Sequence, residues 1–277
     1  MSDNHPLLRW APVVATCAIA GLAAACGGGP PAPRTDAERL TLGKQIVDRM
    51  SAKLASAQSF SAKTHEVRHT TNSKGEPRQD TFDRETVVKR PDRLYTTTSG
   101  DRRNETWYDG VGLTLVLHKD KVFAQARMPE TLDKTLDAMH ERYGVATPLS
   151  DFIYSSPSKA LITDTTTGGW VGREAVDGQE TDHLAFKDKG VSWEVWIPST
   201  GDPLPRKFVA EFTEDKRLRK VELAFSEWNL APQIASDRFK PTVPPDYEGI
   251  AIVQRARVLR NVSPDEAAAP TGGTVKK

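Results

Sequence analysis

Short segments in which apolar and polar residues alternate make up most of the chain and restrict what it can fold into. An alternation with a period of two is typical of β-strands that bury one face. The segments lie at 60–70, 81–89, 93–98, 105–108, 113–118, 121–127, 169–175, 180–187, 191–197, 206–212 and 221–229. Turn sequences such as Asp109-Gly110 and Asp177-Gly178 separate several of them. Short strands joined by tight turns predict an antiparallel meander.

Helical patterns precede this meander and interrupt it. Thr35 and Glu38 have the spacing of a capping box at the start of an amphipathic segment that extends to residue 58. A second segment of helical spacing covers residues 129–143, and one or two shorter helices are expected within 148–163. We therefore predict an α+β fold that is mainly antiparallel β, with a helical insertion between two β-rich halves.

The N-terminal region has the layout of a secretory signal. Arg9 precedes an uncharged, alanine-rich run at 10–25, which is shorter than the ~20 residues that a membrane-spanning helix needs. Residues 22–27 read Leu-Ala-Ala-Ala-Cys-Gly and resemble a bacterial lipobox, in which the cysteine is acylated after cleavage. We predict that residues 1–25 are a signal peptide and that Cys26 carries a lipid. The alternative is cleavage after Ala-x-Ala, which would release a soluble protein.

The remaining chain is predicted to be one tethered domain. Glycines and prolines dominate residues 26–34, which we expect to form a flexible spacer. Residues 35–262 are long enough for a single domain with its own core, and residues 263–277 are expected to be disordered. Gly27 follows the cysteine where an aspartate would favour inner-membrane retention. We therefore expect lipid anchoring on the periplasmic side of the cell envelope, at the outer membrane.

Composition excludes several chemistries. The two cysteines of the chain are Cys17, inside the signal, and Cys26, so the mature body has no internal disulfide, cysteine-based zinc site or cysteine nucleophile. A formal net charge of +1 provides no overall field that would attract nucleic acid. We expect no nucleic-acid partner.

Sequence patterns of enzymes and metal sites are not found. His65 and His69 would lie ~13 Å apart in a strand, too far to share one zinc ion. The sequence contains neither Gly-x-Ser-x-Gly nor a glycine-rich phosphate loop. Asp151, Asp164 and His183 occur near serines without any specific spacing. We therefore predict a non-enzymatic protein with no catalytic residues, no metal ligands and no cofactor.

Several local strings carry a resemblance to a known family. They are Trp107-Tyr108-Asp109-Gly110, Pro148-Leu149-Ser150-Asp151-Phe152-Ile153-Tyr154, Val176-Asp177-Gly178, His183-Leu184-Ala185-Phe186, Trp193-Glu194-Val195-Trp196-Ile197 and Pro203-Leu204-Pro205-Arg206. In this order, over residues 35–239, they resemble an uncharacterised family of predicted bacterial periplasmic proteins. That family is similar to the lipoprotein-carrier superfamily of LolA, LolB and LppX. The resemblance implies a strongly curved, incomplete β-barrel covered by short helices, with a hollow that binds lipid or acyl chains.

Aromatic and aliphatic residues are the candidates to line such a hollow. Trp193 and Trp196 are three residues apart in a predicted strand, so their side chains are expected on opposite faces of the sheet. One of them would line the hollow and the other would lie on the outer surface. The full candidate set is Phe123, Leu136, Met139, Phe152, Ile153, Phe186, Trp193, Trp196, Phe208 and Phe225.

Three functions remain open at this point. The first is a lipid-anchored envelope protein that holds a lipid or lipoprotein acyl chain between sheet and helices, in lipid or lipoprotein transport. The second is an envelope interaction or stress-sensor module whose hollow is filled by side chains. The third is an envelope hydrolase, which would need polar residues gathered in a cleft.

Overall fold

The computed structural model describes residues 32–101, 103–143, 148–215 and 217–252. The predicted signal peptide, Cys26, the first part of the spacer and the C-terminal tail therefore lie outside the described residues. The helices are α1 (Asp36–Ser56), α2 (Leu132–Tyr143), the 3-10 helix η1 (Pro148–Phe152) and α3 (Pro157–Leu161). The strands are β1 (Ser59–Thr71), β2 (Pro77–Lys89), β3 (Arg93–Gly100), β4 (Asn104–Tyr108), β5 (Gly112–Leu117), β6 (Val122–Arg127), β7 (Thr167–Val176), β8 (Gln179–Asp188), β9 (Val191–Pro198), β10 (Lys207–Phe212), β11 (Leu218–Asn229) and β12 (Glu248–Ile250).

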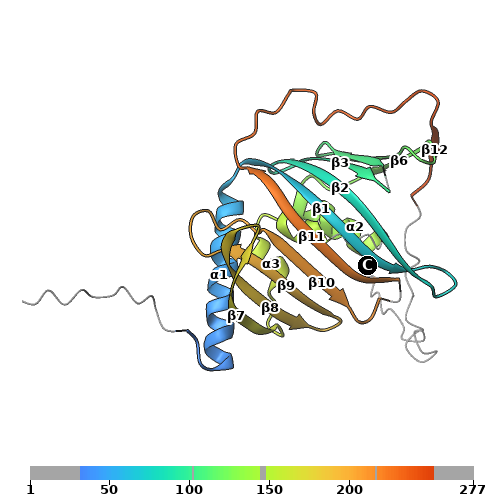
Figure 1. Cartoon of the computed structure of the whole chain (residues 1–277). Coiled ribbons are helices and arrows are strands. Elements are labelled where there is room, and N and C mark those ends of the chain that lie inside the picture. The colour runs from blue at the N-terminus through green and yellow to red at the C-terminus, as the bar shows by residue number, and fades with distance from the viewer. Residues whose placement is uncertain (1–31, 102, 144–147, 216, 253–277) are drawn as a thin grey trace, which may run out of the picture. The chain divides into compact units, whose positions relative to one another are not determined.

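All the described strands form one sheet in the order β12-β6-β5-β4-β3-β2-β1-β11-β10-β9-β8-β7. Every neighbouring pair is antiparallel except β12 with β6, which is parallel. The order has two free ends, so the sheet stays open, and Figure 1 shows it curving strongly around α2 and α3. The predicted fold class, an antiparallel sheet curved into an incomplete barrel and covered by helices, is confirmed.

Helix α1 begins where the capping box predicts. The Glu38 backbone N–H donates to Thr35 Oγ1 over 3.2 Å, and the Thr35 backbone N–H donates to Glu38 Oε2 over 3.0 Å. These bonds satisfy two backbone donors that a helix start otherwise leaves unpaired. One side of the helix is buried against the sheet, with Ile46 and Leu54 at most 1% exposed.

Two hydrophobic clusters lie on the concave side of the sheet. The first lies between α1 and strands β8 to β11 and contains Met50, Phe186 and Phe208. The second lies between α2 and strands β1 to β5 and contains Phe60 and Leu132. Each helix therefore covers a different half of the sheet, and the short helices η1 and α3 pack between them.

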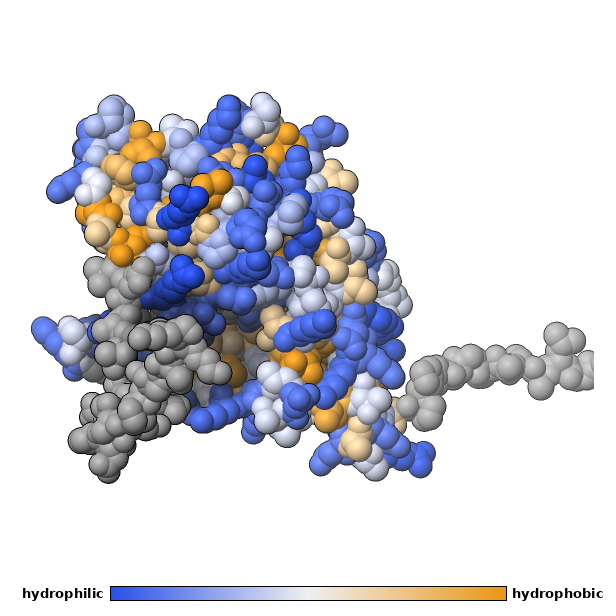
Figure 2. All heavy atoms as spheres, turned by 180° about the vertical axis from the view of Figure 1, so that it is seen from behind, coloured by the Kyte–Doolittle hydropathy of each residue, from blue (hydrophilic) through white to orange (hydrophobic). Residues whose placement is uncertain are grey.

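The convex face of β2 to β6 is covered by the segment that follows β11. Phe239 from this segment packs with Tyr95 and Trp107 of the sheet, and Arg238 lies 5.1 Å above the Tyr95 ring. The segment ends in β12, which the sequence does not predict because three residues are too few to show an alternating pattern. Among the described residues, the exposed large hydrophobic side chains are Val111, Val171 and Ile250, and Figure 2 shows polar side chains over most of one face.

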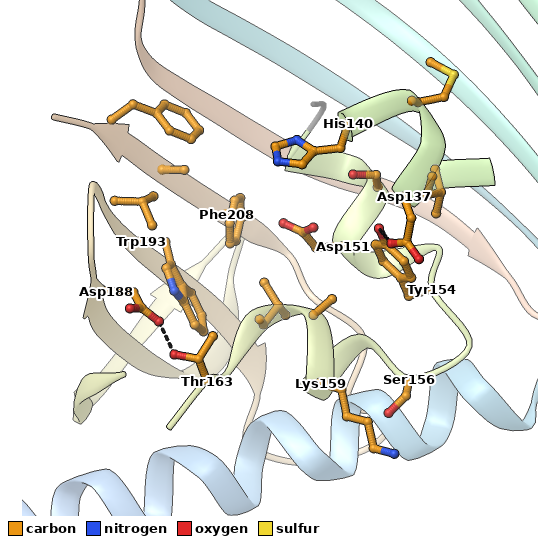
Figure 3. A pocket seen from close by; sticks show the side chains of 18 of the residues that line it. Asp137, His140, Asp151, Tyr154, Ser156, Lys159, Thr163, Asp188, Trp193 and Phe208 are labelled. Carbon is orange, nitrogen blue, oxygen red and sulfur yellow. Dashed lines mark hydrogen bonds between the residues drawn. The ribbon is translucent and has the colours of Figure 1, made fainter. Parts of the chain in front are cut away.

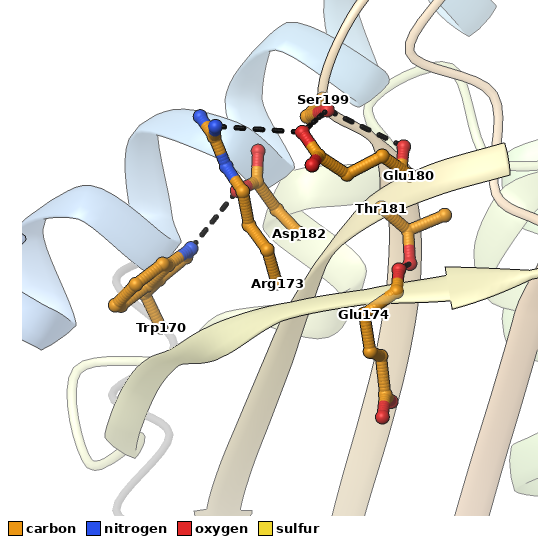
Figure 4. A network of polar contacts seen from close by, with 7 residues as sticks. All are labelled: Trp170, Arg173, Glu174, Glu180, Thr181, Asp182 and Ser199. Carbon is orange, nitrogen blue, oxygen red and sulfur yellow. Dashed lines mark hydrogen bonds and ion pairs between the residues drawn. The ribbon is translucent and has the colours of Figure 1, made fainter. Parts of the chain in front are cut away.

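A polar network holds the hairpin of β7 and β8 at the free edge of the sheet (Figure 4). Asp182 accepts hydrogen bonds from Trp170 Nε1 over 3.0 Å and from Arg173 Nε over 3.1 Å. Glu180 accepts from Ser199 Oγ over 2.9 Å, which joins β8 to the end of β9. The two bonds to Asp182 join β7 to β8. They therefore hold β7 at the edge of the described sheet, where β8 is its one neighbouring strand.

Two glycines allow α1 to approach the edge strand β7 closely. A Cβ atom on Gly43 would lie 2.9 Å from Gly169 Cα and 3.0 Å from Trp170 N. Gly169 has a φ of +143° and its backbone faces Arg39 O.

We expect Gly43→Val to lower the free energy of unfolding by about 1–3 kcal/mol, because the added side chain separates helix from strand. Denaturant unfolding followed by circular dichroism measures this.

Gln45→Val is the matched control for this substitution. Gln45 is exposed on the same helix, so the same new side chain there changes only helix propensity, by a few tenths of a kcal/mol. Equal losses in the two variants would contradict the assigned contact between α1 and β7.

Candidate ligand-binding cavity

A cavity of about 1230 Å³ lies between the helices and the concave face of the sheet (Figure 3). It is bounded by α2, η1, α3 and the ends of β8 to β11. The lining residues are Asp133, Leu136, Asp137, Met139, His140, Ser150, Asp151, Tyr154, Ser155, Ser156, Lys159, Ala160, Leu161, Thr163, Thr165, Asp188, Lys189, Val191, Trp193, Phe208, Ala210, Phe212, Asp215 and Leu218.

The sheet side of the cavity is apolar. Trp193 on β9 and Ala210 on β10 are direct cross-strand partners, and both line the cavity. Trp193 stacks on Phe186 with 4.4 Å between ring centroids, and Phe152 packs edge-on against Phe208 at 5.3 Å. The aromatic wall is therefore supported from behind by other rings, which fix the rotamers of the side chains that face the cavity.

The helical side is held by hydrogen bonds to distant parts of the chain. The Ser158 backbone N–H donates to Ser51 Oγ over 3.0 Å, which joins α3 to α1. Arg90 Nη2 donates to Tyr154 O over 3.0 Å, which joins the end of β2 to the segment after η1. The Tyr154 hydroxyl donates to Asp137 Oδ1 over 2.8 Å and so connects that segment to α2. The helices are thus fixed at a distance from the sheet that leaves the cavity open.

A threonine cluster organises one rim of the cavity. Asp188 accepts hydrogen bonds from the hydroxyls of Thr163, Thr165 and Thr166, and from the backbone N–H of Lys189. These donors stabilise the carboxylate and hold the pKa of Asp188 well below its ordinary value. Asp188 therefore remains ionised, and it ties the loop before β7 to the turn between β8 and β9.

Asp151 is a titratable group in the cavity wall. Its carboxylate is half-buried in η1 and has no hydrogen-bond or ion-pair partner within the described part of the chain. Desolvation by the surrounding protein raises the pKa of Asp151 to about 7. Burial also raises the pKa of Tyr154, followed by its hydrogen bond to Asp137 and the negative charges of Asp137, Asp151 and Asp133. Near neutral pH, Asp151 therefore exchanges between neutral and charged forms.

The structure places four of the ten predicted lining residues at the cavity: Leu136, Met139, Trp193 and Phe208. Four others, Phe152, Ile153, Phe186 and Phe225, are buried on the same side of the sheet, in the hydrophobic clusters behind the cavity wall. Their side chains support the lining residues and are not in contact with the open space. Sequence alternation alone does not separate these two groups, because both face the concave side.

The remaining two predicted lining residues, Phe123 and Trp196, lie on the convex face. Phe123 packs against Gly249 of β12 and the convex cluster. Trp196 stacks on His183 with 4.3 Å between ring centroids, and Lys207 Nζ lies 4.5 Å from its centroid. Trp193 and Trp196 do point to opposite faces, as predicted from their spacing. Contrary to the prediction, the structure does not place Trp196 or Phe123 in the lining of the cavity.

The polar residues considered for a hydrolase are not brought together. Asp151 faces the cavity, whereas His183 lies on the convex face and pairs with Glu194 over 2.6 Å. His65 contacts Asp83 and His69 contacts Glu222, so each uses its own carboxylate partner. No group of three or more His, Cys, Asp or Glu side chains that could hold a metal ion occurs in the described ranges.

The acidic rim of the cavity was not predicted from the sequence. Asp133, Asp137, Asp188 and Asp215 come from three separated parts of the chain, and no local motif connects them. Asp151 is part of a string already recognised as characteristic, but its position in the cavity depends on the fold. The described helices include none that is long and apolar enough to span a membrane.

Several solved structures are similar to this one at low sequence identity, whereas no curated protein matches the sequence. The fold is similar to an uncharacterised conserved protein from Thermus thermophilus, with 12% identity, a TM-score of 0.45, and 75% of this chain and 98% of that chain covered. The LolA superfamily protein from Nitrosomonas europaea has 13% identity and a TM-score of 0.37, with 72% and 98% covered.

The lipoprotein LppX from Mycobacterium tuberculosis has 13% identity and a TM-score of 0.38, with 69% of this chain and 97% of that chain covered. At these identities and TM-scores, no ligand or activity transfers from the similar structures. A family model matches residues 43–253, which is most of the chain and includes the whole cavity. The chain therefore belongs to the family described as predicted periplasmic protein (DUF2092).

Proposed function

We propose that this protein is a non-enzymatic envelope protein that binds a lipid or an acyl chain in the cavity between α2, η1, α3 and the sheet. The observation that carries the proposal is the cavity itself, with a volume of about 1230 Å³ and an aromatic wall that includes Trp193 and Phe208. Sites for small molecules are concave, mostly apolar and often near 300–1,000 Å³. This cavity is large enough for a ligand with a long apolar chain.

The apolar wall gives such a ligand a sufficient driving force. Each methylene group removed from water contributes about 0.8 kcal/mol, so a chain of about twelve carbons contributes roughly 10 kcal/mol before the costs of association. Ring packing behind Trp193 and Phe208 fixes these side chains, which reduces the entropy lost on binding. The polar rim leaves room for a head group at the mouth.

Anchoring at Cys26 would bring the proposed cavity close to a membrane. The family is described as predicted periplasmic, which agrees with export through the N-terminal signal. Acylation at Cys26 with attachment to the outer membrane is part of the proposal. A tethered carrier meets the same membrane repeatedly, so it exchanges ligand with that membrane without diffusing away. The role that follows is in lipid or lipoprotein transport.

A cavity-filling substitution tests the binding site. We expect Ala210→Phe to weaken uptake of a fluorescent apolar dye by about tenfold or more, because the new ring occupies space between Trp193 and the helices. Titration of the purified body with N-phenyl-1-naphthylamine, followed by lipid extraction and native mass spectrometry, measures the loss. A retained thermal unfolding midpoint verifies that the variant folds.

Ala224→Phe provides the matched control, since Ala224 is exposed on the neighbouring strand β11 and does not line the cavity. Its dye uptake should equal that of the unsubstituted protein. If neither protein takes up dye or lipid and crosslinking in cells gives one reproducible protein partner, the interaction or sensor module replaces this proposal.

Lipid anchoring is tested at the cysteine. We expect Cys26→Ser to abolish incorporation of labelled palmitate and to move the protein from the membrane fraction to the soluble fraction, because the acyl chains supply the membrane affinity. Cys17→Ser is the control: its thiol lies within the predicted signal, so labelling and fractionation should not change. Membrane retention of Cys26→Ser would instead indicate an uncleaved anchor.

A further inference from the structure

We infer that the ligand of the cavity carries a positively charged head group, such as a protonated amine, and that Asp151 is its counter-ion. This inference rests on the proposed function and adds the chemical class of the ligand. Its basis is the charge around the cavity, where acidic side chains outnumber basic ones.

The rim of the cavity is acidic. Five aspartates line it, and they face two lysines and one histidine. The acidic residues are Asp133, Asp137, Asp151, Asp188 and Asp215, and the basic ones are His140, Lys159 and Lys189. These groups come from α2, η1, α3 and the turns after β8 and β10, so they surround the mouth. A low-dielectric wall of apolar side chains strengthens the field of such a ring at the centre of the cavity.

None of these carboxylates forms an ion pair with a cation of the described ranges. Their hydrogen-bond partners are neutral: Ser155 for Asp133, the Tyr154 hydroxyl for Asp137, and the backbone N–H groups of residues 217 and 218 for Asp215. Arg90 lies within electrostatic reach of Asp133, but it donates its hydrogen bond to Tyr154 O. The negative charge of the rim therefore remains available to a ligand.

Asp151 is the member of this set that lacks a partner among the described residues. It belongs to the one-turn helix η1, and Figure 3 shows it in the space between α2 and Phe208. A carboxylate that is desolvated without a hydrogen-bond partner is costly, and this cost raises its pKa to about 7. An ammonium group at the mouth would supply the missing hydrogen bonds and the opposite charge.

Charge complementarity selects the occupant. An alkyl chain fits the aromatic wall of Trp193 and Phe208, and an ammonium head fits the five aspartates at the mouth. A phosphate head of the same chain would place a second negative charge next to Asp151 and Asp188, and like charges at this range repel. The geometry thus points to a cationic, single-headed amphiphile and disfavours an anionic one.

Proton exchange accompanies this binding. When an ammonium head binds at low pH, the neutral Asp151 carboxyl must release its proton to solvent, and the carboxylate then pairs with the ammonium. The head group keeps its own proton throughout, since alkyl ammonium groups titrate near the pKa of lysine. Below about pH 7 the affinity should therefore fall with decreasing pH, by at most about tenfold per pH unit.

Titratable and charged groups on every element around Asp151 line the same cavity. They are His140, Asp133 and Asp137 on α2, Tyr154 after η1, Lys159 on α3, Asp188 and Lys189 between β8 and β9, and Asp215 between β10 and β11. Asp188 is held ionised by its threonine donors and so contributes a constant negative charge. The part of the pH dependence that belongs to Asp151 is isolated by substituting it.

The experiment compares three probes that share one alkyl chain: dodecylamine, dodecyl phosphate and dodecyl maltoside. Each displaces a bound apolar dye from the mature protein in buffer without other detergent, between about pH 5 and about pH 8. We expect dodecylamine to bind about tenfold or more tightly than dodecyl phosphate near pH 8, and to lose this advantage as the pH falls.

Asp151→Asn separates the counter-ion from the rest of the rim. The variant should lose the pH dependence of amine binding and about tenfold of amine affinity near pH 8, while dodecyl maltoside binds as before. Its stability should not fall: because burial raises the pKa of Asp151 from 3.8 to about 7, the folded state loses stability as the pH rises from about 4 to about 7 and stays at the lower level above, and an amide avoids this loss. Asp237→Asn, an exposed carboxylate distant from the cavity, is the control.

The outcomes distinguish this inference from the proposed function. Equal binding of all three probes, or tighter binding of the phosphate, overturns the cationic head group and leaves the apolar cavity in place. Unchanged amine affinity and pH dependence in Asp151→Asn overturn the counter-ion role. If the protein binds none of the probes and no dye, the proposed function itself fails.

Discussion

A strongly curved sheet cannot cover its own concave face, and this packing requirement governs the rest of the structure. The sheet leaves a hollow that only elements from elsewhere in the chain can fill. Helix α1 covers one half through Ile46 and Leu54, and α2 covers the other half through Leu132. Because η1 and α3 are short, they reach the sheet without filling the space before Trp193 and Phe208. The cavity is thus the part of the concave face that the helices leave uncovered.

Local patterns in the sequence determine a large part of this architecture. The period of two identifies the strands because one face of each strand is buried, and the capping box at Thr35 and Glu38 places the start of α1. Tight turns between consecutive strands lead to the antiparallel order along most of the sheet. The opposite orientations of Trp193 and Trp196 also follow from spacing alone. These features share a physical cause that acts over a few residues.

Other features depend on contacts between distant residues and could not be read from local patterns. Phe123 lies beside β12 on the convex face, where its strand partner Gly249 follows 126 residues later in the chain. Phe186 and Phe208 alternate in the same way along their strands, but only the helices decide which ring meets open space. The environment of Asp151 is set by α2, η1 and β10 together, so its raised pKa has no signature in the surrounding sequence.

The acidic rim also bears on selectivity. The proposed carrier, if tethered to a membrane, would be surrounded by a large excess of bulk lipid, and specificity is the difference between the affinity for the proper ligand and that for its competitors. An apolar wall alone would accept any acyl chain, because methylene groups carry no identity. Aspartates at the mouth would repel phosphate heads while attracting cationic ones, so the same carboxylates both favour one class of ligand and exclude the commonest competitors. The uncompensated charge at the cavity mouth is therefore more informative about the ligand than the aromatic wall.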